Sequence, residues 1–329
     1  MDDSIYKIFL SLQTRENIVT DCFYAASLPF TNQHKIGISI DGFPLFFIEC
    51  NGKEHSTDIN LELISVQFNR NCRIKMNGFD DFENIYTIVS LKTTNIDFQR
   101  YFIEVVCLML KQMPNNPTQK QIKTEIQKLV ELFSRFTQPP KKTIQGLWAE
   151  LLIIDQAKKP EYLIQSWHSF SEDKFDFNDG HDKIEVKSTS QLRRVHHFAY
   201  EQLNPNKNSN LIIASVFVIQ TGKGKSIFDL KESIFKKVTN LQLQLKLNEV
   251  IFQTLGNDFE KIFDVYYDYQ QAIDTLEFYD GKDIPNIKKE QIPAEITNVH
   301  FDCDLSEIST LKNKEFNTSY SPLFKSISI

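Results

Sequence analysis

The stretch that most constrains the fold of this chain is residues 174–187, KFDFNDGHDKIEVK, which has the pattern of a tight β-hairpin. Asp179-Gly180 tolerates the positive φ angles that a two-residue hairpin turn requires. With the turn at that position, we expect Asp176 to lie opposite Lys183. Residues 174–187 therefore predict two antiparallel strands joined at Asp179-Gly180.

The predicted hairpin separates a polar face from an apolar one, because side chains alternate between the two faces of a strand. The polar face carries Asp176, Lys183, Glu185 and Lys187, and the apolar face carries Phe175, Phe177, Ile184 and Val186. Asp176 and Glu185 are expected to be diagonal neighbours, roughly 7–8 Å apart at the backbone. Two carboxylates at this separation can hold Mg²⁺, whose oxygen ligands lie at about 2.1 Å. The pattern thus predicts a metal site on the polar face.

Lys187 adds a cation to this site, since it lies two residues beyond Glu185 and points the same way. A lysine there can orient or deprotonate an attacking water, or stabilise the charge that builds on a phosphate. A metal lowers the pKa of a bound water and neutralises developing negative charge. Together these residue types suit hydrolysis of a phosphodiester. The alternative is an amphipathic hairpin with one solvated face and ordinary cross-strand ion pairs.

The segment before the hairpin predicts a helix with one acid in an apolar run. Residues 146–154, GLWAELLII, are good helix formers and are apolar around most of the circumference. Glu150 is the only charge among them, and burial of a carboxylate without a partner costs free energy. Gly146 lies one turn earlier, where a missing side chain lets a metal or a phosphate come close. Glu150 is therefore a candidate ligand, the alternative being a glutamate that reaches solvent at the helix edge.

The order of these motifs resembles the PD-(D/E)XK, or restriction-endonuclease-like, nuclease superfamily. Its pattern is a helix with Gly-x-x-x-Glu, a strand with Asp, a strand with Glu-x-Lys, a helix and an apolar strand, and residues 141–220 follow that order. The resemblance implies an α/β (α+β) fold with an αβββαβ core around a mixed sheet. Within it we expect a first strand at Tyr162–Phe170, a helix at Ser190–Leu203 and a closing buried strand at Leu211–Ile219.

More narrowly, the chain resembles a bacterial family of unknown function that is placed in this superfamily and occurs in restriction-like defence gene clusters. The likeness rests on Gly146–Leu151, Lys174–Phe177, Ile184–Thr189, and His197-Phe198 leading to Gln202-Leu203. The proline that usually precedes the first Asp of the motif is absent, because Phe175 occupies its position.

This resemblance implies roles for the site residues. Glu150, Asp176 and Glu185 would bind the metal, Lys187 would be the catalytic lysine, and Gln202 matches a glutamine that several branches of the superfamily place near the site. The implied cofactor is Mg²⁺, for which Mn²⁺ can substitute. The implied activity is that of an endodeoxyribonuclease in a bacterial restriction or anti-phage system. A nuclease-like DNA-binding or assembly subunit that has lost cleavage is the alternative, and the presence of all four catalytic residues favours the enzyme.

The segment after the hairpin is locally basic and is a candidate DNA-binding surface. Residues 186–225 hold six lysines and arginines against one acid, Glu201. Cationic contacts dominate affinity for a phosphate backbone, so the segment indicates contact with double-stranded DNA. The candidate residues are Arg193, Arg194, His196 and His197. A solvated charged face is the alternative, and the adjacent histidines lack the helical spacing of a zinc site.

Composition limits the remaining possibilities. The net charge is −6, so any DNA contact must be local. The five cysteines, Cys22, Cys50, Cys72, Cys107 and Cys303, never form a C-x-x-C pair, which indicates reduced thiols in a cytoplasmic protein. With no signal peptide and no long apolar span, no membrane partner is expected. Gly222–Ser226 lacks the first glycine of a Walker A motif, because that position is Ile219.

The chain divides into three predicted parts. Residues 1–140 are expected to be strand-rich and to end in an amphipathic helix, 141–225 to be the nuclease-like core, and 226–329 a helical elaboration. The first part contains a hairpin signal at Asp41-Gly42 and helical patterns at Phe98–Lys111 and Gln119–Phe136. By the resemblance, a methyltransferase or ATPase subunit is an expected protein partner. A second copy of the chain is another, because cutting both strands requires two sites.

Overall fold

The computed structural model describes residues 3–13, 22–49, 56–76, 78–114, 117–134, 143–168, 173–206, 208–256, 262, 265–311 and 322–327. The chain forms two compact units, residues 1–138 and 139–329, each considered separately below. In the described part of the chain, no helix has the length and apolar character needed to cross a bilayer.

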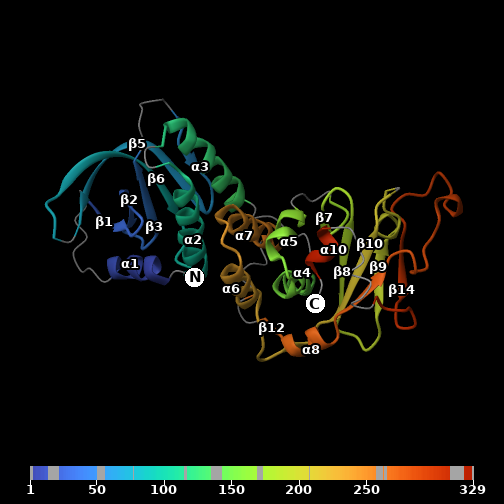
Figure 1. Cartoon of the computed structure of the whole chain (residues 1–329). Helices are drawn as coiled ribbons and strands as arrows, with labels where there is room; N and C mark the ends of the chain where they lie inside the picture. Colours follow the sequence, from blue (N-terminus) through green and yellow to red (C-terminus); the bar gives the residue numbers. More distant parts are fainter. Residues whose placement is uncertain are drawn as a thin grey trace. The chain divides into compact units, whose positions relative to one another are not determined.

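The first unit is built on one curved antiparallel sheet that closes on itself (Figure 1). Its strands run in the order β1-β2-β3-β6-β5-β4, and β1 also pairs in parallel with β5 through Phe23 and Ile74. The elements are α1 (Asp3–Gln13), β1 (Phe23–Leu28), β2 (Thr31–Ile38), β3 (Pro44–Glu49), β4 (Ile59–Asn60), β5 (Ile64–Lys75), β6 (Phe82–Leu91), α2 (Ile96–Gln112) and α3 (Gln119–Ser134).

The strand-rich character, the hairpin and the two helices predicted within the first unit are confirmed. Strands β2 and β3 flank Asp41-Gly42, where Gly42 has the positive φ of +80° that favours glycine. The helical pattern at Phe98–Lys111 lies within α2, and the one at Gln119–Phe136 corresponds to α3, with residues 135 and 136 outside the described ranges. The helices pack on each other through aromatic rings, with the centroids of Phe102 and Phe133 5.5 Å apart. The N-terminal region is therefore strand-rich, as its turn signals indicate.

The second unit has a mixed sheet in the order β13-β10-β8-β7. Strands β8 and β10 are parallel, while β7 and β13 are antiparallel to their neighbours, which confirms the α+β class and the mixed sheet. The elements are α4 (Ile144–Gln156), α5 (Pro160–Ser166), β7 (Phe177–Asn178), β8 (Lys183–Thr189), β9 (Val195–Ala199), the 3₁₀ helix η2 (Tyr200–Leu203), β10 (Leu211–Phe217), β11 (Gln220–Thr221), α6 (Ile227–Lys237), α7 (Leu241–Leu255), β12 (Tyr266–Tyr267), α8 (Tyr269–Asp274), β13 (Glu277–Asp280), η4 (Lys289–Gln291), β14 (His300–Asp304) and α10 (Pro322–Ser326).

Two elements predicted for this unit are wrong. Tyr162–Phe170 is largely the helix α5 rather than a strand, because Pro160 has the φ angle of a first helical residue. Residues 169 and 170 lie outside the described ranges. Ser190–Leu203 is not an α-helix but the strand β9 followed by η2, since β9 pairs with β14 about a hundred residues later. A partner that remote leaves no local signal.

The predicted hairpin forms with a different register. Phe177 pairs with Ile184 and Asn178 with Lys183, so the loop has four residues, Asp179–Asp182, instead of two. Asp179 widens it, because its Oδ1 accepts hydrogen bonds from the backbone N–H groups of His181 and Asp182 at 2.9 and 2.8 Å. Extended by one residue, this register brings Asp176 beside Glu185 rather than opposite Lys183.

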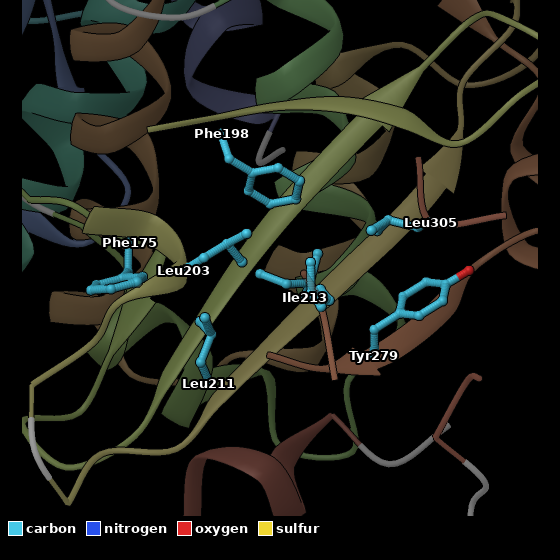
Figure 2. Close-up of a cluster of buried hydrophobic side chains, with 8 residues drawn as sticks. Phe175, Phe198, Leu203, Leu211, Ile213, Tyr279 and Leu305 are labelled. Atoms are coloured by element: carbon cyan, nitrogen blue, oxygen red, sulfur yellow. The ribbon is translucent and has the colours of Figure 1, made fainter. Parts of the chain in front are cut away.

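Phe175 does not follow the predicted alternation, because residues 174–176 form a bend rather than a strand. Phe177 stacks on Trp167 with ring centroids 6.4 Å apart. Phe175 instead joins a buried cluster on the face of the sheet that carries Glu185, since Ile213 of that cluster is the register partner of Glu185. Figure 2 shows the cluster, made of Phe175, Phe198, Leu203, Leu211, Ile213, Tyr279, Ile284 and Leu305. It is the core that holds β9 and η2 over β8 and β10.

Residues 226–329 are helical at their start and add strands to the same unit. The helical stretch predicted at 227–255 is two helices, because Asn240 begins a second one by accepting hydrogen bonds from the N–H groups of Gln242 and Leu243. Strand β13 extends the mixed sheet beside β10, and β14 pairs with β9. The boundary predicted near residue 225 stays a prediction.

Candidate active site

The centre of the candidate site is formed by β8 and by Asp176, the residue that precedes β7. Asp176 and Glu185 are 5% and 4% exposed, so both carboxylates are withdrawn from water. The backbone N–H of Val186 donates to Asp176 Oδ2 at 2.7 Å, which fixes the Asp176 side chain against β8. The hairpin therefore holds two buried acids next to one another.

Lys187 and Gln202 form a closed triangle with Glu185. Lys187 Nζ lies 2.9 Å from Glu185 Oε1 and donates to Gln202 Oε1 at 2.9 Å. Gln202 Nε2 donates to Glu185 Oε1 at 2.5 Å, and Gln202 Oε1 also accepts the backbone N–H of Ala199 at 3.0 Å. The ammonium lies 4.9 Å from the ring centroid of Phe198, a cation–π contact. Gln202 therefore orients both the lysine and the glutamate from η2.

Glu150 lies inside the unit rather than at a solvated helix edge. It is 2% exposed, and its Oε2 accepts a hydrogen bond from Trp167 Nε1 at 2.7 Å. His168 Nε2 lies 3.1 Å from the same oxygen. The backbone N–H of His168 donates to the Asp176 carbonyl oxygen at 2.9 Å, which ties this segment to the hairpin.

The structure brings together one candidate metal-ligating group, in which His168 joins two of the predicted ligands. One ligand atom each from Glu150, His168 and Asp176 lies within 4.8 Å of the other two, and among the described residues this trio alone meets that condition. Two of the three predicted ligands, Glu150 and Asp176, are thus adjacent, while Glu185 faces Lys187. Buried carboxylate oxygens suit a divalent cation, so the residues fit the implied metal.

His168 could have been found only through the correct secondary structure. The residue follows α5 directly, and a strand at 162–170 gave no reason to place it near Glu150. A helix beginning at Pro160, as the proline itself favours, ends at Ser166 and leaves Trp167 and His168 at its exit. Trp167 Nε1 and His168 Nε2 are the two nitrogen atoms that contact Glu150 Oε2.

Two of the predicted DNA-binding residues are buried. Arg194 is 7% exposed, donates to the Ser215 carbonyl oxygen at 2.9 Å and pairs with Glu277 at 2.9 Å. His196 Nε2 lies 2.8 Å from Ser215 Oγ. Burial, together with the nearby charges of Lys187 and Arg194, lowers the pKa of His196 to about 4. Both side chains bind β9 to the sheet and do not offer their charge to a ligand at the surface.

The other two predicted DNA-binding residues are exposed. Arg193 lies on the loop before β9, next to the fully exposed Leu192. His197 Nδ1 contacts Asp302 Oδ1 at 2.9 Å, and its ring stacks on His300 with centroids 5.2 Å apart. The contact of Arg193 and His197 with DNA stays a prediction, and these are the two predicted DNA-binding residues whose side chains are exposed.

The far end of α4 is anchored by a buried carboxylate. Asp155 accepts hydrogen bonds from Ser233 Oγ at 2.6 Å, Tyr269 OH at 2.5 Å and Lys237 Nζ at 2.7 Å. Burial opposes ionisation of Asp155, but these hydrogen bonds outweigh it and hold the pKa of the carboxyl below its ordinary value. Asp155 thereby joins α4, which carries Glu150, to α6 and α8.

Comparison with known proteins gives one match. The model of the family described as "Putative PD-(D/E)XK family member, (DUF4420)" matches residues 33–306, more than half of the chain. No curated protein and no solved structure matches. The match spans every residue of the candidate site.

Proposed function

The chain belongs to this family, DUF4420, and from that premise we propose that it is a Mg²⁺-dependent endodeoxyribonuclease of a bacterial restriction or anti-phage defence system. The observation that carries the proposal is the convergence on one hairpin of Asp176, Glu185 and Lys187, with Glu150 beside Asp176. Family membership indicates nuclease chemistry, and buried acids next to a lysine have the composition that such chemistry requires.

The site residues would divide the work of hydrolysis. Glu150, Asp176 and Glu185 would hold the cation, which when bound supplies charge neutralisation at the phosphate and a more acidic water. Lys187, fixed by Glu185 and Gln202, would orient the attacking water or stabilise the charge on the phosphate. Mn²⁺ would substitute for Mg²⁺, because it accepts the same oxygen ligands.

Double-stranded DNA is the proposed substrate, and the protein is proposed to act in the cytoplasm. Arg193 is exposed on the loop before β9 and His197 is exposed on β9, the strand that leads directly into η2. Since η2 carries Gln202, a phosphate backbone bound by these residues would lie along the segment that leads to the site. A second copy of the chain, and a methyltransferase or ATPase subunit, remain proposed partners.

The test is cleavage of unmodified plasmid and phage DNA by the purified chain. We expect cutting in the presence of Mg²⁺ or Mn²⁺, loss of cutting on chelation with EDTA, and recovery when the metal is restored. Equal cutting in EDTA would contradict a metal-dependent site. Binding of DNA without cutting under any of these conditions would instead support the alternative, a nuclease-like DNA-binding or assembly subunit.

Replacement of Gln202 by alanine is expected to lower the turnover rate about 10-fold, because the amide orients both Lys187 and Glu185. DNA affinity should change little, since Gln202 is held within the unit. Steady-state cleavage kinetics and a DNA-binding assay measure the two quantities. Gln191→Ala, an exposed amide in the loop after β8, is the matched control and should behave like wild type. A Gln202→Ala chain with unchanged turnover would show that the Gln202 amide has no role in the reaction.

A further inference from the structure

We propose that His168 is a metal ligand, and that Glu150, His168 and Asp176 together form a position for a divalent first-row transition cation, with Mn²⁺ as its probe. The inference deepens the proposed function, on which it rests, by assigning a nitrogen donor to a site otherwise composed of oxygens. Three separate stretches of the chain supply the ligands, namely α4, the exit of α5 and the bend before β7.

The group is enclosed. Glu150 and Asp176 are 2% and 5% exposed, and the His168 side chain is 13% exposed. Two acids in a dehydrated volume are costly, because burial penalises their charged forms and their charges repel each other. A divalent cation between them would remove both costs.

The backbone of His168 is fixed beside the hairpin. The backbone N–H of His168 donates to the Asp176 carbonyl oxygen, and Trp167 forms a β-bridge with Phe177, so residues 167–168 pair with residues 176–177. Lys246 of α7 donates to the carbonyl oxygens of Gln165 and Trp167 at 2.8 and 3.0 Å, which also fixes the exit of α5. The ligand set is therefore positioned by the fold.

The donor set favours one class of cation. Mg²⁺ prefers an octahedron of oxygens and retains its waters, whereas Mn²⁺ and the later first-row metals also accept imidazole nitrogen. A site with two carboxylates and one imidazole should thus bind Mn²⁺ more tightly than Mg²⁺. Glu185, which lies against Lys187, belongs to the oxygen part of the site that Mg²⁺ can use.

The experiment measures metal binding by the full chain without DNA. Calorimetry with Mn²⁺ and Mg²⁺ gives the two affinities, and pulsed electron paramagnetic resonance of bound Mn²⁺ detects coupling to a ligand nitrogen. For wild type we expect tighter binding of Mn²⁺ than of Mg²⁺, with nitrogen coupling. For His168→Gln we expect at least about a 10-fold loss of Mn²⁺ affinity and no nitrogen coupling, while Mg²⁺ affinity is retained.

The choice of glutamine separates ligation from a structural role. A glutamine amide can still donate to Glu150, so a role for His168 limited to its contact with Glu150 would leave Mn²⁺ affinity unchanged in His168→Gln. His181→Gln is the matched control, because the His181 side chain is 69% exposed on the hairpin loop. The proposal is overturned if wild-type Mn²⁺ shows no nitrogen coupling, or if His168→Gln binds Mn²⁺ as wild type does.

The outcome is independent of the cleavage assay. If the chain binds Mn²⁺ through His168 but cuts no DNA, the proposed metal site is supported and the proposed nuclease function is refuted. If the chain cuts DNA with Mg²⁺ but His168→Gln binds Mn²⁺ as well as wild type does, the proposed function is supported and His168 is not a metal ligand.

Discussion

Asp176→Ala is expected to lower DNA cleavage by about 10³-fold or more, and Lys187→Met by about 10²–10⁴-fold. Asp176 is the acid that lies both beside Glu150 and at the hairpin, so its removal takes away a proposed metal ligand. Lys187 is 2.9 Å from Glu185 and supplies the positive charge of the site. Single-turnover cleavage rates at saturating metal measure both effects.

The two variants should differ in what they retain. Lys187→Met keeps every proposed ligand, so its metal affinity should match or exceed that of wild type, whereas Asp176→Ala should bind metal at least about 10-fold more weakly. Lys174→Met, which removes an exposed lysine two residues before Asp176, is the control for a general loss of positive charge. Wild-type rates in Lys187→Met would show that the catalytic centre lies elsewhere.

Asp155→Ala is expected to lower the free energy of unfolding of the second unit by about 3 kcal/mol, which is the largest stability effect that we predict. The change removes the acceptor shared by Ser233, Tyr269 and Lys237. The Lys237 side chain is 41% exposed and recovers part of its hydration, so we take the lower end of the range for a broken buried pair. Urea unfolding followed by tryptophan fluorescence is the measurement, because both tryptophans, Trp148 and Trp167, belong to this unit.

The same carboxyl gives a pH dependence with a defined sign. Because the pKa of Asp155 is lowered in the folded chain, its contribution is fully present above the unfolded-state pKa of about 3.9 and is lost as pH falls through the folded-state pKa. Wild type should therefore lose more stability than Asp155→Ala on acidification below pH 4. Glu232→Ala, at an exposed position of α6, is the control and should change stability by less than about 0.5 kcal/mol. Equal acid sensitivity in Asp155→Ala and wild type would refute the assignment.

Short-range patterns predicted the acids and the lysine of the site, but not their pairing. Alternation along β8 is a local property, so Glu185 and Lys187 could be placed on one face from the sequence. The register depended on the side chain of Asp179, which hydrogen-bonds within the loop and makes it two residues longer. The register of the hairpin shifts by two residues, an even number. Asp176 therefore lies beside Glu185, and the side chains of β8 keep the faces predicted for them.

Long-range pairing accounts for the remaining errors. The segment after β8 contains Val195 and Phe198, which favour a strand, but β9 forms only because β14 lies beside it. The burial of Arg194 follows from the same packing, since its guanidinium reaches Ser215 on β10 and Thr275 after α8. Neither contact could be inferred from charge counts along the sequence, where Arg193 and Arg194 are equivalent.

The pairing of β9 with β14 also sets the order in which a newly made chain can mature. His197 and Asp302 are 105 positions apart, so a nascent chain displays the whole hairpin, Lys187 and Gln202 long before the strand that supports β9 emerges from the ribosome. Gln202 lies in η2, which follows β9 directly. We therefore expect the triangle of Glu185, Lys187 and Gln202 to close only after β14 has been synthesised.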